Sequence, residues 1–534
     1  MKAPLLTSIC TAALMALSIA LSPSSPACTN LIVTKGASTD GSVICTYNCD
    51  TFGYSGWLTH SPAGRHEKGE KIPIRSFWHP AEIKGYVDQV EYTYSVIGYI
   101  NEHQLCIVET TFGGRTELVN PEGILGYDNV IQLALQRCTT ARDAIRTMGE
   151  LMDEYGYCDE GETFTVCDTE EAWIMELIGK GPGRKGAVWV ALRIPDGQIS
   201  AHANLSRIRQ IPFKDKENCM YSEDVVSFAR EMGFFSGKDS DFSFRDAYCP
   251  ISFLGVRMGD TRVWSFFRHH TDTAEMDRYL PYLDGEFETC DHLPLWITPD
   301  SKLSVRDIMK DMRDHYEGTP LDMTTGIDAG PWGMAVRPRA KTYESGGRKY
   351  FRERPIASPQ AGFTLVSQLR GWLPDEVGGI MYFNCDDADM VAYVPVYCGS
   401  NSIPKAFDAD NNKNGEFNWN GAFWLCNLVS NMIYPRYSAM IGSLREAQAE
   451  LEDFYASEQE EVAKVATSMT PLDRITFLNG KTAVYTNKMM DRWNSLFKEL
   501  AVKYNDQPGG YDQQFYDEIV RATGDRFKVP DSNN

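Results

Sequence analysis

Segments that alternate apolar and polar residues, joined by short turns, fill much of the first 210 residues of the chain. The stretch CTNLIVTKGASTDGSVICTYNCD shows this alternation on both sides of a Gly/Ser/Asp turn, which predicts a β-hairpin over residues 29–34 and 42–48. The pattern recurs near 91–99 and 105–111, and again in TFTVCDTEEAWIMELIG and GAVWVALRIPDGQISAHANLSRI. Because strands joined by hairpins are antiparallel, the chain is predicted to build antiparallel sheets and not the doubly wound sheet of a nucleotide-binding fold.

Two other regions carry helical periodicity. The stretch YDNVIQLALQRCTTARDAIRTMGELMDEYG has apolar residues at helical spacing, interrupted by CTTARD, so Thr139 or Thr140 is expected to cap a second helix from about Ala141. The C-terminal part is predicted to be mostly helical over residues 421–466 and again over roughly 471–504. Strands, then helices, then more strands indicate an α+β fold with antiparallel sheets covered by helices.

The N-terminal residues are typical of a secretory signal peptide. Lys2 precedes an apolar run over about 5–21, and the small residues Ser25 and Ala27 stand at the −3 and −1 positions of a cut before Cys28. The run is too short and too rich in hydroxyls to predict a membrane span. We therefore predict export to the periplasm or the extracellular space, with Cys28 as the first residue of the mature chain.

Lipidation of Cys28 is the main alternative. A bacterial lipoprotein signal also ends just before a cysteine, but usually with Leu near −3 and Gly or Ala at −1. Here only Ala27 fits that pattern. An acyl chain on Cys28 would hold the protein on a membrane surface.

Composition excludes several classes of function. The formal net charge of −21 argues against nucleic acid as a partner, because its phosphates require a basic surface. Beyond the signal peptide no segment reaches about 18 uninterrupted apolar residues, so no membrane span is predicted. Of the 14 cysteines, 13 follow Cys10, and their spacing shows no compact disulfide framework. Cys106, Cys167 and Cys426 stand in apolar runs and are predicted to be buried thiols.

No set of residues has the spacing of a metal site. Cys45 and Cys49 form a pair without a second pair or a nearby histidine. The run that begins at Asp410 resembles the start of a calcium loop, but Gly421 stands where a bidentate Glu is needed. We predict neither a metal nor a cofactor.

An N-terminal cysteine has a chemical advantage as a nucleophile. Its own α-amino group, with an unperturbed pKa of about 7.7–8.0, can accept the thiol proton near neutral pH. The reaction that suits such a residue is acyl transfer through an oxyanion intermediate and a thioester. Asp50, after the second predicted strand, could orient the amine, and the Asn204 amide could donate to the oxyanion. Each has a simpler interpretation, since Asp50 fits a turn and Asn204 begins a glycosylation sequon.

Several stretches, taken in order, resemble a known family. They are ACTNLIVTKGASTDGS, NEHQLCIVETTFGGR, LGYDNVIQLALQRCTTARDAI, DTEEAWIMELIGKG, RIPDGQISAHANLSRI, DHYEGTPLDMT and LRGWLPDEVGGIMYF. The chain resembles the secernin-like dipeptidases, a branch of the N-terminal-nucleophile hydrolases related to penicillin V acylase and bile salt hydrolase. The resemblance implies a four-layer αββα sandwich. The predicted division is then a signal peptide over 1–27, a hydrolase domain over 28–400 and a mostly helical region over 401–534.

The resemblance also implies roles for individual residues. Cys28 would be the nucleophile of metal-free peptide hydrolysis, Asp50 would orient its amine, and Asn204 would donate to the oxyanion. Thr111 falls where relatives place another oxyanion-hole group, for which its backbone N–H is the candidate, and Arg207 is a candidate for binding a substrate carboxylate. One position departs from the family: Tyr47 stands where relatives carry an arginine, and it can donate one hydrogen bond but not a fixed positive charge.

These observations predict an exported dipeptidase that acts on short peptides through an N-terminal cysteine. Two alternatives stay open: an amidase or acylase on acylated amines, of the penicillin V acylase or bile salt hydrolase type, and a lipidated, inactive surface protein that binds a partner. A dipeptidase needs a cation and an anion to meet the free termini of its substrate, whereas an acylase needs a hydrophobic slot. The sequence also leaves a homo-oligomer open.

Overall fold

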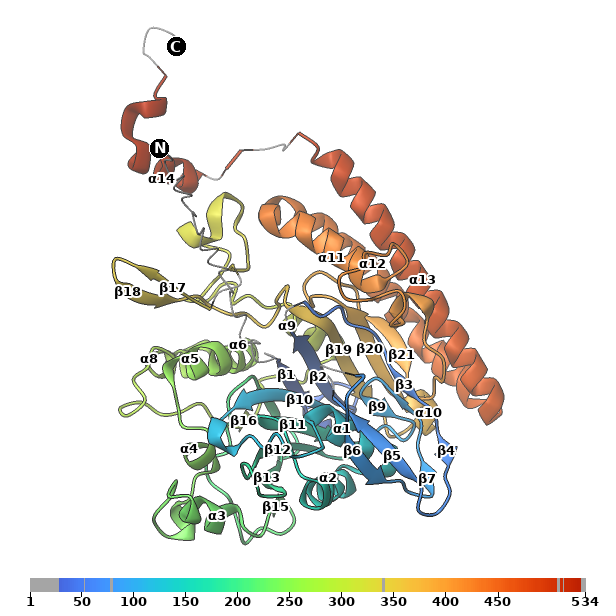
Figure 1. Ribbon diagram of the computed structural model, residues 1–534. Helices are drawn as coiled ribbons and strands as arrows, with labels where there is room; N and C mark the ends of the chain where they lie inside the picture. Colours follow the sequence, from blue (N-terminus) through green and yellow to red (C-terminus); the bar gives the residue numbers. More distant parts are fainter. Residues whose placement is uncertain are drawn as a thin grey trace, which may run out of the picture.

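Two antiparallel sheets stack face to face in the centre of the computed structural model (Figure 1). The structure describes residues 28–51, 53–76, 80–338, 341–506, 510–511 and 513–529, so the predicted signal peptide lies outside the described residues. In spatial order the first sheet contains β16 (Trp296–Ile297), β14 (Ile199–His202), β1 (Asn30–Val33), β2 (Val43–Asp50), β19 (Ala361–Leu369), β20 (Gly379–Cys385) and β21 (Val394–Tyr397). The second contains β15 (Cys219–Tyr221), β13 (Ala187–Arg193), β12 (Ala172–Gly179), β11 (Gly161–Cys167), β10 (Cys106–Gly113), β9 (Ile100–Asn101), β8 (Val96–Ile97) and β3 (His60–Ser61).

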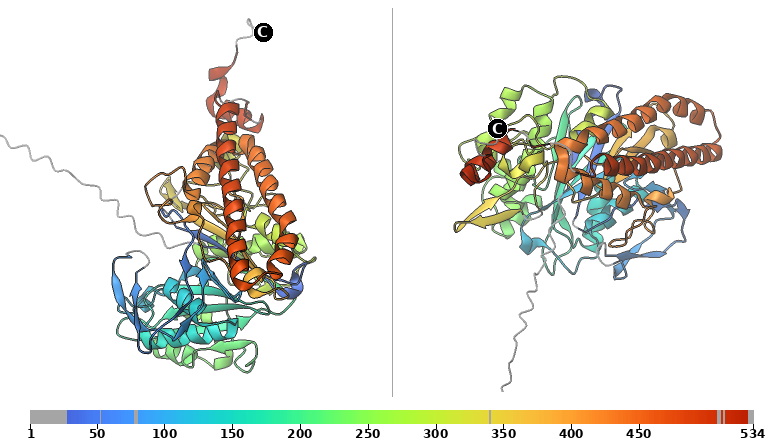
Figure 2. Two further views of the ribbon diagram at one scale, coloured as in Figure 1. Left: turned by 90° about the vertical axis from the view of Figure 1, so that its right-hand side faces the viewer. Right: turned by 90° about the horizontal axis from the view of Figure 1, so that it is seen from above.

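Helices cover the outer face of each sheet. α1 (Tyr127–Arg137) and α2 (Ala141–Tyr155) pack on the second sheet. α11 (Ala422–Ile433), α12 (Tyr437–Thr467) and α13 (Pro471–Lys503) cover the first, with α12 and α13 side by side (Figure 2). The predicted α+β class and the sandwich of two antiparallel sheets between helical layers are confirmed.

The C-terminal helices share the apolar core of the first sheet. Trp493 of α13 is fully buried, and its indole Nε1 donates to the carbonyl oxygen of Met390 at 3.2 Å. Glu452 of α12 accepts from the backbone N–H of Tyr393 at 3.0 Å. These helices therefore complete the core of the sandwich.

Most local predictions agree with the structure. β1 and β2 form the expected hairpin, with Ile32 opposite Cys45. The Thr140 hydroxyl caps α2 by accepting from the Asp143 N–H at 3.2 Å. The single strand predicted near 91–99 is wrong: the chain forms β7 (Tyr92–Thr93), β8 and β9. Gly98 adopts a φ of +57°, which folds β8 back onto β9 in a tight turn.

The cysteines behave as small apolar residues. All 13 from Cys28 onward have free thiols, and Cys106, Cys167 and Cys426 are buried as predicted. Within the described residues, no helix combines the length and apolarity that crossing a membrane requires.

The middle of the chain supplies short helices and a small ribbon beside the sandwich. They include α3 (Val225–Glu231), α4 (Phe244–Tyr248), α6 (Thr261–His269), α9 (Val305–Asp311) and the hairpin of β17 (Thr342–Ser345) and β18 (Arg348–Phe351). α6 packs against β14 of the first sheet. This contact brings one arginine of α6 to the start of β1.

Candidate active site

Cys28 lies at the start of β1, where the two sheets meet. The backbone N–H of Thr29 donates to the carbonyl oxygen of Asn48 at 3.3 Å, and the N–H of Asn48 donates to the carbonyl oxygen of Thr29 at 3.0 Å. This bridge holds Cys28 beside the end of β2. The side chain is fully buried. Its Sγ lies 3.5 Å from Oε1 of Glu109 and 3.9 Å from Oη of Tyr47.

Arg262 of α6 joins Cys28 to Asn204. Its Nη1 donates to the carbonyl oxygen of Cys28 at 2.7 Å and to Oγ1 of Thr29 at 2.6 Å. Its Nη2 donates to Oδ1 of Asn204 at 2.8 Å. Burial lowers the pKa of this guanidinium to about 9, with a further contribution from the charge of Arg354. Arg262 was not among the predicted residues, and it lies 234 positions from Cys28 in the sequence.

Asn204 is turned toward this cluster by its backbone. It adopts a φ of +55°, a left-handed conformation in which asparagine is well tolerated. Its Nδ2 donates to the carbonyl oxygen of Thr111 at 2.6 Å. The structure therefore brings together Asn204, Thr111 and Cys28, with Arg262 as the link between Asn204 and Cys28, and the catalytic roles assigned to these residues stay predictions.

Asp50 ends β2 and is fully buried. Its Oδ2 accepts from Nη2 of Arg354 at 2.6 Å, while Oδ1 has no hydrogen-bond partner among the described residues. Burial raises the pKa of Asp50 to about 6, against the opposing charges of Arg354 and Arg262. Asp50 is also close enough to Cys28 for its charge to help raise the pKa of the thiol.

This shift predicts a pH-dependent stability. Below about pH 3 the Asp50 carboxyl is protonated in both states, and from about pH 3 to 7 the unfolded chain is the more ionised of the two, so the folded state loses stability as pH rises. With a folded pKa of about 6 and an ordinary value of 3.8, the loss is about 3 kcal/mol and is complete above about pH 7. We expect the free energy of unfolding of the wild type, minus that of Asp50→Asn, to fall by this amount between about pH 3 and 7. Urea unfolding of both, with a short extension ahead of Cys28, measures it, and parallel pH profiles would contradict it.

Arg207 has a different environment from the one its predicted role requires. Its Nε pairs with Oδ1 of Asp260 at 3.2 Å, and Nη1 and Nη2 donate to the carbonyl oxygens of Ala201 and Pro294 at 2.6 and 2.5 Å. The side chain is buried. A substrate carboxylate would have to displace these partners. Its substrate-binding role stays a prediction, and its contacts favour a structural one.

The nucleophile candidate is surrounded by acids and phenols. Burial raises the pKa of the Cys28 thiol well above its usual range, and Cys49 and Glu109 raise it further. Tyr47 donates its hydroxyl to the Glu109 carboxylate, so the tyrosine does make the single hydrogen bond predicted for it. No histidine of the described residues hydrogen-bonds to Cys28. The thiol is therefore protonated at rest and needs a base other than histidine.

Comparison with known proteins identifies the family of the chain. The pattern of Peptidase family C69 matches residues 71–450, well over half of the sequence. The chain belongs to peptidase family C69. The predicted resemblance is thereby confirmed.

Relatives in this family carry consistent names. A probable dipeptidase from Salmonella dublin is 25% identical over 397 residues, which cover 70% of this chain and 81% of the relative. A probable dipeptidase from Latilactobacillus sakei is 26% identical over 443 residues, or 77% of this chain and 82% of the relative. A probable dipeptidase B from Streptococcus pyogenes serotype M1 is 23% identical over 360 residues, which cover 65% of this chain and 64% of the relative.

The C69 match includes some of the cluster but not all of it. Glu109, Asn204 and Arg262 fall within residues 71–450, whereas Cys28 and Asp50 precede them. The proposed roles of Cys28 and Asp50 therefore depend on the contacts described above.

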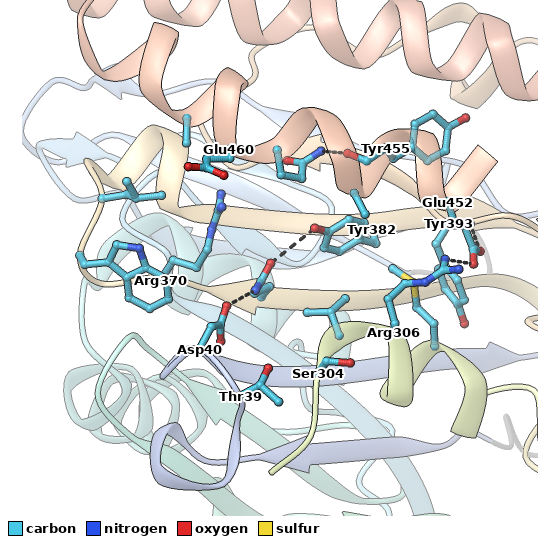
Figure 3. Close-up of a pocket in the computed structure, with 18 of the residues that line it drawn as sticks. Thr39, Asp40, Ser304, Arg306, Arg370, Tyr382, Tyr393, Glu452, Tyr455 and Glu460 are labelled. Carbon is cyan, nitrogen blue, oxygen red and sulfur yellow. Dashed lines mark hydrogen bonds and ion pairs between the residues drawn. The ribbon is translucent and has the colours of Figure 1, made fainter. Parts of the chain in front are cut away.

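A large pocket lies elsewhere on this C69 chain. It has a volume of about 770 Å³ between α12 and the outer face of β19 and β20, where Gln368, Tyr382 and Glu460 line it (Figure 3). The neighbouring Ser367 faces inward, because its Oγ accepts from the Cys106 thiol of the other sheet. The pocket and Cys28 thus lie on opposite faces of the first sheet, and none of the predicted site residues lines the pocket.

Proposed function

We propose that the protein is an exported dipeptidase in which cleavage before Cys28 creates an N-terminal cysteine nucleophile. One observation carries the proposal: Asp50 is buried beside Cys28 with a carboxylate oxygen that no described residue hydrogen-bonds. A buried carboxylate oxygen without a donor is costly. The α-amino group that cleavage would create supplies donors at this place.

The first chemical step then needs only Cys28 itself as acid and nucleophile. The neutral α-amine accepts the thiol proton and becomes an ammonium, while Sγ attacks the carbonyl carbon of the scissile amide. The ionised Asp50 carboxylate orients the amine and stabilises the ammonium. The high pKa of the buried thiol means that its proton leaves during attack and not before.

Asn204 and Arg262 support the charge that attack creates. Attack turns the carbonyl oxygen into an oxyanion, which the Asn204 amide and the Thr111 backbone N–H are proposed to receive. Arg262 holds both Asn204 and the Cys28 carbonyl, so it positions donor and nucleophile together. The ammonium next gives its proton to the leaving nitrogen, the C–N bond breaks, and a thioester remains. Water, deprotonated by the same amine, hydrolyses the thioester and restores the thiol.

Cations gather near the site, where a free peptide carboxylate would need them. Lys341 is solvent-exposed but lies near Arg354 and Arg262, and partial desolvation together with the charges of these two arginines lowers its pKa to about 8. Lys341, Arg352 and Arg354 also line one small cleft. An anionic C-terminus is the natural ligand of such a group. This charge and the names of the relatives favour a dipeptidase over an acylase.

The proposal is tested on protein exported by a bacterial host. We expect intact and N-terminal-peptide mass spectrometry to find an unmodified chain that begins at Cys28, and we expect this chain to hydrolyse dipeptides in the presence of a chelator. A lipid-sized mass on Cys28 would support the surface binding protein. Turnover of acylated amines without turnover of dipeptides would support the acylase.

A further inference from the structure

Glu109, which contacts the candidate nucleophile, and its neighbour Glu162 are two buried carboxylates without a cationic partner among the described residues. Glu109 of β10 and Glu162 of β11 are both fully buried. Oε1 of Glu109 accepts from Tyr47, and Oε1 of Glu162 accepts from the Thr111 hydroxyl at 2.8 Å. Oε2 of each carboxylate faces no fixed donor among the described residues, and the two carboxyl groups lie close enough to share a hydrogen bond when one of them is protonated.

The negative charge of these two carboxylates is not balanced by a nearby cation. Across the described parts of the chain, no lysine, arginine or histidine lies within ion-pair distance of Glu109 or Glu162. Burial raises the pKa of both carboxyls, and the charge of Glu109 further raises that of Glu162. A buried acid that lacks a cation lowers stability, so its presence next to a nucleophile indicates a binding role.

We propose that Glu109 binds the free α-ammonium group of the substrate residue whose carbonyl Cys28 attacks. The enzyme would then accept peptides with a free N-terminus and reject N-acylated or desamino analogues. This inference rests on the proposed function, because it assigns the substrate end that lies on the acyl side of the scissile bond.

Peptide stereochemistry places the ammonium close to Glu109. In a near-attack geometry Sγ lies about 3–3.5 Å from the carbonyl carbon. The α-nitrogen is two bonds beyond that carbon, about 2.5 Å away, so it lies within about 6 Å of Sγ. Oε1 of Glu109 is 3.5 Å from Sγ and therefore stands inside the same shell. An ammonium there would supply the cation that the Glu109 carboxylate lacks among the described residues, and it would relieve the repulsion between Glu109 and Glu162 when both are ionised.

The rest of the site favours this orientation of the substrate. Arg354 and Arg262 lie around Asp50 with Lys341 near both arginines, whereas Glu109 and Glu162 form the acidic side. A dipeptide that lies across Cys28 then has its ammonium on Glu109 and its carboxylate toward the cations. A neutral acyl chain is expected to bind poorly on the acidic side, because such a chain would leave the Glu109 carboxylate buried without a cationic partner.

The test compares the dipeptide that the processed wild type cleaves fastest with the same molecule bearing hydrogen in place of the α-amine. We expect kcat/KM to favour the free amine by at least about 100-fold, because a buried carboxylate rejects an analogue that lacks its partner. Glu109→Gln should reduce this ratio to below about 5-fold, and Glu109→Asp should keep part of it. Glu150→Gln, at an exposed position on α2, is the charge-matched control and should keep all of it.

Each outcome bears on the inference. A wild type that cleaves both molecules equally would overturn the ammonium site while leaving the dipeptidase proposal standing. An equal loss on both substrates in Glu109→Gln would show that Glu109 acts on the reaction itself, and would also overturn it. A processed chain that cleaves no dipeptide at all would remove the proposed function. Circular dichroism identifies an unfolded Glu109→Gln, in which case the wild-type ratio and Glu109→Asp decide.

Discussion

Replacing Cys28 with alanine is expected to lower dipeptide hydrolysis by at least about 10³-fold while the protein stays folded. The loss is large because the variant has no group that can form the thioester, and removal of a nucleophile costs orders of magnitude in kcat. The structural cost is small, because alanine removes only one buried sulfur atom and leaves the backbone that Arg262 holds. Initial rates on a dipeptide and urea unfolding of the same preparation measure both quantities.

Cys167→Ala is the matched control for this prediction. Cys167 is also a fully buried free thiol, but it lies on β11 and does not touch the cluster around Cys28. We expect this variant to lose a similar amount of stability and to keep its turnover. Hydrolysis that persists in a correctly processed Cys28→Ala protein would exclude the cysteine mechanism.

Local signals in the sequence were sufficient for much of the fold. The alternation on either side of residues 35–41 predicts the β1–β2 hairpin, because only one register buries the apolar residues of both strands. Thr140 followed by Asp143 predicts the start of α2, since the capping contact involves only four consecutive residues. The turn at Gly98 was missed because β-branched and aromatic residues on both sides of it outweighed one glycine.

The candidate site was only partly accessible to the same reasoning. Cys28, Asp50 and Asn204 follow from chemistry and from the family resemblance, and the structure places them around one arginine. Arg262 carries no local signal, because its helix also contains Arg268 and only tertiary packing decides which of the two is buried. Glu109 did carry a signal: a carboxylate in the middle of the apolar strand CIVETTF is unusual, and such a residue is often functional.

The free α-amine is the second group whose loss should abolish activity. We expect a chain that retains one glycine ahead of Cys28 to hydrolyse dipeptides at least about 10³-fold more slowly than the chain that begins at Cys28. The extra residue converts the amine into an amide, whose nitrogen cannot accept the thiol proton at neutral pH. Every side chain is unchanged, so the comparison isolates the base from the nucleophile.

Two preparations from one tagged precursor make this measurement, one cleaved to leave Cys28 first and the other to leave glycine first. Removal of the glycine with an aminopeptidase should restore the rate, which excludes irreversible damage as the cause of the loss. Equal rates in the two preparations would require another base. Glu109 is the carboxylate nearest to the thiol, with its Oε1 at 3.5 Å from Sγ. Equal rates would remove the amine mechanism. They would remove the ammonium site as well only if Glu109 is the base, because a base at Glu109 could not also hold the substrate ammonium. A large difference leaves Glu109 available to the substrate.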